Sequence, residues 1–240
     1  AQTKDLGYKK DNLIALRIGT EDASSKFESL KSSFLNIPGV TSVASGNYAP
    51  SEMILADNGF YLPGGNSENR TVVKRNGVSD GYFKTMGIPL VKGRDFTAAD
   101  TVDQIIVNEA TLKAFDIKLE NALSSTLIQG TDEETFEMRI IGVVADYHFA
   151  SLREEIQPLF LHKEMEPNWL FLKTNTDNYA SLIAGMEDQW KFYSIDVDYF
   201  FSHKSLVLRK ALQIYHRHLY ETHVGQPDLF LNYLSCHQVQ

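Results

Sequence analysis

The sequence predicts a mixed α/β fold (α+β) in which one subdomain is split in the chain. Two stretches, one near each end, have the pattern of strand–helix–strand units, each about thirty residues long as such units usually are. The stretch between them has shorter elements separated by turns. A chain of 240 residues also exceeds the usual domain size of about 100–150 residues. We therefore expect the two units to pack as one sheet with helices, and the middle of the chain to be inserted.

The first unit begins with an apolar run at residues 13–18, which predicts a buried strand. Ser25 and Glu28 have the spacing of a capping box and predict a helix start. The apolar residues that follow recur at helical spacing: Phe27, Leu30, Phe34 and Leu35. Pro38-Gly39 ends this helix, and residues 40–44 predict the second strand.

The second unit begins with a strand at residues 169–173, after which Asp177 or Asn178 can cap a helix. One face of that helix is apolar: Tyr179, Leu182, Ile183, Met186 and Trp190. A final half-buried strand is predicted by alternating apolar residues: Ile195, Val197, Tyr199 and Phe201.

The middle of the chain, residues 78–156, is expected to consist of short elements. A helical turn ends at Gly87, and a strand-like run then leads to a second turn at Gly93. We expect loops at three glycine-containing stretches, residues 58–59, 63–66 and 130–134.

Composition excludes several classes of function. The formal net charge of −8 and the lack of a basic cluster argue against a nucleic-acid partner. A single cysteine, Cys236, excludes a disulfide within the chain. No Walker A sequence is present, so the chain is not expected to hydrolyse ATP. No apolar run reaches the about 18–20 residues of a membrane span, and the polar start does not look like a signal peptide.

Three groups of polar residues have features of metal-binding or catalytic sites, but for each group we favour a structural role. Asp95, Asp100 and Asp103 lack the alternate-position ligands of a calcium loop. Asp146 and His148 flank Tyr147 in a strand-like run with no activated nucleophile nearby. Three tail histidines would not converge on one helix face: His216, His218 and His223. We therefore predict no catalytic residue, no cofactor and no metal.

Five segments, in order, resemble motifs of the MacB-like periplasmic core domain of bacterial ABC-transporter permeases, the group that includes MacB, LolC/LolE and FtsX-like proteins. The most informative is GYFKTMGIPLVKGRDF at residues 81–96. The others are DLGYKKDNLI at 5–14, IIVNEA at 105–110, IIGVVADYH at 140–148 and SLREEIQP at 151–158. Each motif alone is weak, but the ordered set covers residues 1 to 200 and is fairly specific.

The resemblance implies a domain organisation as well as a fold. Residues 1–77 and 157–202 would form the split "Porter" subdomain, and residues 78–156 the inserted "Sabre" subdomain. Residues 203–240 match neither. They hold five of the seven histidines and four Lys/Arg against two Asp/Glu, and we interpret them as a divergent or non-native tail.

The resemblance also implies a function. The chain would be a non-enzymatic domain on the periplasmic face of the bacterial inner membrane, between two membrane helices, and would transmit ATP-driven motion to export or extraction of a substrate. Its partners would be a cytoplasmic ABC ATPase subunit, a second permease copy or paralogue, and a periplasmic adaptor. Two alternatives remain: a free-standing periplasmic binding or adaptor module, and a small-molecule hydrolase on an α/β scaffold. No residue selects the transported substrate.

Overall fold

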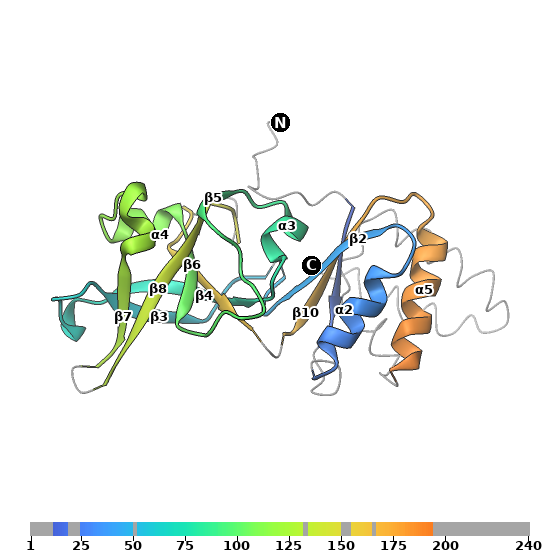
Figure 1. Ribbon diagram of the computed structural model, residues 1–240, viewed down its shortest axis with the longest axis horizontal. Coiled ribbons are helices and arrows are strands. Elements are labelled where there is room, and N and C mark those ends of the chain that lie inside the picture. Colours follow the sequence, from blue (N-terminus) through green and yellow to red (C-terminus); the bar gives the residue numbers. More distant parts are fainter. Residues whose placement is uncertain are drawn as a thin grey trace, which may run out of the picture.

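The structure is a computed structural model, shown as a ribbon in Figure 1. It describes residues 12–18, 25–49, 52–131, 134–149, 155–164 and 167–193. The predicted strand containing Ile195 and Phe201, and the tail with its histidines, lie outside these residues. None of the helices in the described ranges is long and apolar enough to cross a membrane.

One end of the molecule is a sheet of three antiparallel neighbours covered by two helices (Figure 1). β10 (Trp169–Thr174) lies between β1 (Leu13–Arg17) and β2 (Val40–Gly46) and runs antiparallel to both. The helices α2 (Phe27–Leu35) and α5 (Tyr179–Phe192) lie side by side on one face. The two units at opposite ends of the chain therefore share one sheet, which confirms that part of the predicted fold.

Alternation along these strands gives the sheet two buried faces. Ile14 and Leu16 of β1 pack in the core beneath α2 and α5, whereas Leu13 and Ala15 pack in a second core on the opposite face. Successive side chains of a strand point to opposite faces, so a sheet covered on both sides needs a run that is apolar throughout. This explains why β1 has no polar residue before Arg17.

The two helix starts differ from each other and only one was predicted correctly. Asn178 caps α5, because its Oδ1 accepts from the Ser181 N–H at 3.2 Å. The capping box predicted at Ser25 is wrong: α2 begins at Phe27, and Lys26 occupies the cap position without a capping hydrogen bond from its side chain. The Lys26 ammonium instead donates to the carbonyl of Tyr193, 3.0 Å away, beyond the end of α5. This contact links the start of α2 to the residue that follows α5.

The other end of the molecule is a closed ring of six strands, ordered β3–β4–β9–β6–β8–β7. Neighbours pair antiparallel except for β4 with β9 and β6 with β8, which are parallel. The strands are β3 (Asp57–Tyr61), β4 (Thr71–Val78), β6 (Gln104–Asn108), β7 (Thr126–Gly130), β8 (Thr135–Val144) and β9 (Leu159–Lys163). Two short segments cover it, α4 (Glu109–Ala114) and the 3₁₀ helix η2 (Leu119–Ser124). A separate apolar core centred on Phe60 and Phe160 fills the ring.

The loop predicted at residues 58–59 is wrong, because Asn58 and Gly59 lie in the middle of β3. They pair with Val73 and Val72 of β4. Gly59 leaves space that the Arg70 side chain occupies: a Cβ at Gly59 would lie 3.0 Å from Arg70 Cδ. The loop predicted at residues 63–66 is confirmed, and the 3₁₀ helix η1 (Ser67–Asn69) follows it.

The sheet and the ring meet where β4 leaves the ring. Val78 at the end of β4 pairs with Gly46 at the end of β2. The short helix α3 (Tyr82–Met86) packs against β2 and β10, and β5 (Leu90–Gly93) then returns to pair with β8. The division into 1–77 plus 157–202 and 78–156 stays a prediction; the ring also contains β3 and β9, which lie outside 78–156, and β4, of which only Val78 lies inside that range.

Candidate functional site

The fingerprint segment at residues 81–96 lies at the junction between the sheet and the ring. Gly81 and Gly87 flank α3, and both adopt left-handed conformations with φ of +75° and +68°, a region open to glycine without steric cost. Tyr82 on this helix packs edge-on against Phe171 of β10, with ring centroids 5.8 Å apart. The fingerprint helix is therefore an anchor that ties the ring side of the chain to the sheet.

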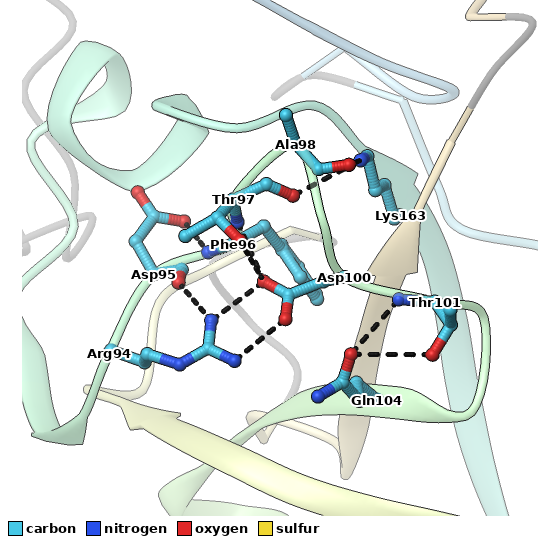
Figure 2. Close-up of polar contacts among 9 residues, drawn as sticks. All are labelled: Arg94, Asp95, Phe96, Thr97, Ala98, Asp100, Thr101, Gln104 and Lys163. Atoms are coloured by element: carbon cyan, nitrogen blue, oxygen red, sulfur yellow. Dashed lines mark hydrogen bonds and ion pairs between the residues drawn. The ribbon is translucent and has the colours of Figure 1, made fainter.

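The second half of the fingerprint forms a closed polar loop around Arg94 and Asp100 (Figure 2). Arg94 Nη1 and Nη2 each lie 2.6 Å from a different carboxylate oxygen of Asp100. This two-pronged geometry is the strongest form of an arginine–carboxylate pair. Arg94 also donates to the Asp95 carbonyl at 3.1 Å, so the guanidinium holds both sides of the loop.

Further donors complete the loop. The Thr97 N–H and hydroxyl both donate to Asp100 Oδ2, at 2.7 and 3.0 Å. Lys163, from β9 of the ring, donates to the carbonyls of Thr97 and Ala98 at 3.1 and 2.6 Å (Figure 2). The hydrogen bonds from Arg94 hold the pKa of Asp100 well below its usual range. Asp100 is thus ionised at neutral pH and holds this loop together through Arg94 and Thr97.

The three aspartates considered as a calcium loop do not converge. Asp100 is occupied by Arg94, and Asp95 Oδ1 accepts from the Phe96 N–H at 2.7 Å. Asp103 accepts from the Thr101 hydroxyl and pairs with Arg139 at 2.9 Å. Within the described residues, no group of three or more His, Cys, Asp or Glu is placed to hold a metal ion.

The run at residues 146–148 follows the end of β8, and its side chains have structural contacts. Asp146 Oδ1 accepts from the Ala110 N–H in α4 at 2.9 Å, and burial raises the pKa of this carboxyl. Tyr147 points into the core, and burial raises its pKa well above the usual range. His148 is partly exposed. The burial of Tyr147 in the core and the contact of Asp146 with α4 therefore account for this run of residues.

Side chains at the junction between the sheet and the ring form hydrogen bonds that the sequence did not predict. Asn47 Nδ2 donates to Glu164 Oε2 at 2.5 Å, and the Asn47 N–H donates to the Gly77 carbonyl at 2.9 Å. Glu52 Oε2 accepts from Trp169 Nε1 at 2.8 Å and from the Ala49 N–H at 2.9 Å. The side-chain partners in the Asn47–Glu164 and Glu52–Trp169 contacts are more than a hundred residues apart, so no local spacing could have predicted these two contacts. The two backbone donors, the Asn47 and Ala49 N–H groups, bond to residues closer in the sequence.

A hollow of about 390 Å³ lies between α2 and α5, away from the fingerprint. Its walls are formed by small and polar side chains of the two helices, among them Ser33, Ser181 and Gly185. Asp188 is the one carboxylate lining it. A catalytic pocket would need several convergent titratable groups, and Asp188 is the one titratable residue among those that line this hollow.

This arrangement, a helix-covered sheet joined to a six-strand ring, is similar in fold to solved structures of two other proteins. The chain is similar to the periplasmic region of MacB from Actinobacillus actinomycetemcomitans, with 16% identity, a TM-score of 0.52, and coverage of 79% of this chain and 87% of that one. It is also similar to a domain of a protein described as a permease, from Porphyromonas gingivalis, with 14% identity and a TM-score of 0.53. That match covers 76% of this chain and 84% of the other.

The resemblance carried by the five sequence motifs is thereby confirmed at the level of the fold. No protein-family model and no curated protein matches the sequence.

Proposed function

We propose that this chain is the extracytoplasmic domain of an ABC-transporter permease in a bacterial inner membrane. In this proposal the domain carries out no chemistry of its own. It transmits movement, driven by ATP hydrolysis on a cytoplasmic ABC ATPase, to the export or extraction of a substrate outside the membrane. The partners are that ATPase, a second permease copy or paralogue, and a periplasmic adaptor.

The observation that carries the proposal is the shared fold with the periplasmic region of MacB over 79% of the chain. The order of the five motifs along the chain supports it independently of the coordinates.

The architecture also suits a mechanical role. The first described strand, β1, is part of the helix-covered sheet, and the last described helix, α5, packs on that sheet. Membrane helices attached on either side would therefore act on this sheet first. Movement would then reach the ring through the Gly46–Val78 pairing, α3, and the Asn47–Glu164 contact.

The location and partners can be tested with the natural gene, tagged and expressed in its own host. We expect the protein in the membrane fraction, and an ABC ATPase should co-purify with it in detergent. The excised segment, residues 12–193, should not retain the ATPase, because the contact runs through membrane helices. A protein recovered from the soluble periplasm without an ATPase would contradict the proposal and favour a free-standing module.

The mechanical part can be tested by locking the junction. Gly46 and Val78 are directly opposite in an antiparallel pair, where Cα atoms lie about 4.5–5.5 Å apart, a separation that a disulfide can span. In the full-length permease, Gly46→Cys with Val78→Cys should slow export under oxidising conditions, and reduction should restore it. Thr126→Cys with Arg139→Cys, a pair within the ring, is the control. Normal export with the junction oxidised would refute transmission through this point.

A further inference from the structure

A small cavity lies in the core beneath α3, where three segments from different parts of the chain meet. Its volume is about 10 Å³. The walls include Asn76 of β4, Tyr82 and Met86 of α3, and Tyr147 and Phe149 from the segment after β8. A space of this size accommodates about one water molecule.

Two of the polar atoms that line the cavity have no hydrogen-bond partner in the protein. They are Asn76 Oδ1 and the Tyr147 hydroxyl. Asn76 is 2% exposed and Tyr147 is 4% exposed, so bulk solvent does not reach either side chain. A buried polar atom left without a partner costs about 1–3 kcal/mol, and native proteins satisfy most such atoms with protein groups or ordered water.

A third hydroxyl is close by. Tyr82 is 2% exposed and lines the same cavity. Tyr82 adds to the effect of burial in raising the Tyr147 pKa, although the Tyr147 hydroxyl forms no hydrogen bond to it. At neutral pH the Tyr147 phenol is therefore protonated, and its hydroxyl can donate as well as accept. The other walls, such as Met86 and Phe149, are apolar.

We propose that this cavity binds one structural water molecule, which donates to Asn76 Oδ1 and bonds to the Tyr147 hydroxyl. The cavity is polar on one side, has room for one water and offers at least two partners, which are the conditions for a stably buried water. The remaining hydrogen of the water, or its second lone pair, is available to Tyr82. The water would link β4, α3 and the segment after β8 at the junction of sheet and ring. This inference does not depend on the proposed function.

The direct test is a crystal structure of the full chain at about 1.5 Å or better, where ordered buried waters are visible. We expect one isolated density peak within hydrogen-bond distance of Asn76 Oδ1 and the Tyr147 hydroxyl. An empty cavity, or a direct hydrogen bond between the two side chains, would overturn the proposal.

A solution test uses ¹⁷O magnetic relaxation dispersion, which counts water molecules that stay bound for longer than the protein tumbles. Asn76→Leu keeps the size of the side chain but removes the acceptor, and should reduce that count by about one. Tyr147→Phe removes the second partner and should shorten the residence time or abolish binding, and it serves if Asn76→Leu does not fold. Tyr179→Phe is the matched control, because its hydroxyl donates to Asn12 Oδ1 in the other core. An unchanged count in both cavity variants would refute the site.

Discussion

Gly93 and Gly142 are directly opposite each other where β5 pairs with β8, and neither position has room for a side chain. A Cβ at Gly142 would lie 2.6 Å from the Arg94 carbonyl oxygen, and a Cβ at Gly93 would contact the Ile141 carbonyl. Gly93 also has a φ of +78°, which disfavours other residues. Two glycines from separate sequence motifs thus form a single close approach of two backbones.

Gly142→Ala should destabilise the protein by about 1–3 kcal/mol, because the neighbouring atoms are backbone and cannot move aside cheaply. Urea denaturation of the two proteins measures this difference. Gly59→Ala is the control, since the atoms nearest to its Cβ belong to the exposed side chain of Arg70. That variant should remain within about 0.5 kcal/mol of the parent. Equal losses for both would show that the Gly142 contact is not tight.

Phe34→Ala should cost about 3–5 kcal/mol, as expected for a fully buried aromatic residue. Phe34 is 0% exposed and its ring stacks on Trp190 of α5, with centroids 6.3 Å apart. The adjacent Leu35 is 44% exposed and provides a control on the same helix. Leu35→Ala should cost less than about 1 kcal/mol. Thermal and urea unfolding report both values, and a reversal of the order would mean that the buried face of α2 is misassigned.

Asp100→Asn should cost about 1–2 kcal/mol at pH 7, since Arg94 loses its charged partner but is itself half exposed to solvent. The folded pKa of Asp100 lies below its unfolded value. Its contribution to stability is therefore present above about pH 3.9 and is lost as the pH falls through the folded pKa. The difference in free energy of unfolding between the parent and Asp100→Asn should therefore narrow below about pH 4. Urea midpoints across pH 7 to 3 test this.

Asp57→Asn is the control for that series. Asp57 pairs with Lys74 at 2.9 Å, but its carboxylate is 43% exposed, so the change should cost less than about 1 kcal/mol. If the difference in stability between the parent and Asp100→Asn stays constant with pH, the role of Asp100 as the charged partner of Arg94 is contradicted.

Calcium should neither bind to the folded domain nor stabilise it. Asp95, Asp100 and Asp103 already accept from separate protein donors, so binding would require breaking these contacts. Isothermal calorimetry should show no saturable heat, and the melting temperature should be the same in calcium and in EDTA. A stoichiometric heat that disappears in an Asp95→Asn, Asp100→Asn double variant would refute this prediction.

The chain alone should be a monomer, or at most a weak dimer, at micromolar concentration. Contacts between domains that meet only part of the time are small and polar, and a net charge of −8 adds mild repulsion at physiological salt. Sedimentation with and without residues 203–240 measures this. A tight dimer that survives removal of the tail would show a strong interface on the folded domain and argue against pairing through the membrane.

Local sequence signals predicted the sheet but not the ring. β1 and β10 are continuous apolar runs, and Asn178 is a standard cap, so neighbouring residues contain the signal. β3 begins Asp-Asn-Gly, which indicates a turn; it is a strand because β4 and β7 supply partners on both sides. The Asn47–Glu164 and Glu52–Trp169 contacts join residues 117 positions apart and leave no local pattern.

In the sequence, the loop between Arg94 and Asp100 could be recognised only through the motif at residues 81–96. Its aspartates were considered as possible metal ligands, whereas the structure pairs one of them with the arginine six residues earlier. Nothing in the spacing identifies which of the three carboxylates the arginine selects.

The pairing of Trp169 with Gly46 has a consequence for the evolution of this architecture. β2 ends and β10 begins at the same level of the sheet, so the chain leaves for the ring and returns at one point. A two-residue turn would close the gap and make β1, α2, β2, β10 and α5 one continuous segment, because such turns join directly opposed antiparallel strands. Rings of different sequence could be exchanged at this position by recombination, provided that each covers the apolar face of the sheet that Leu13, Ala15 and Phe171 form.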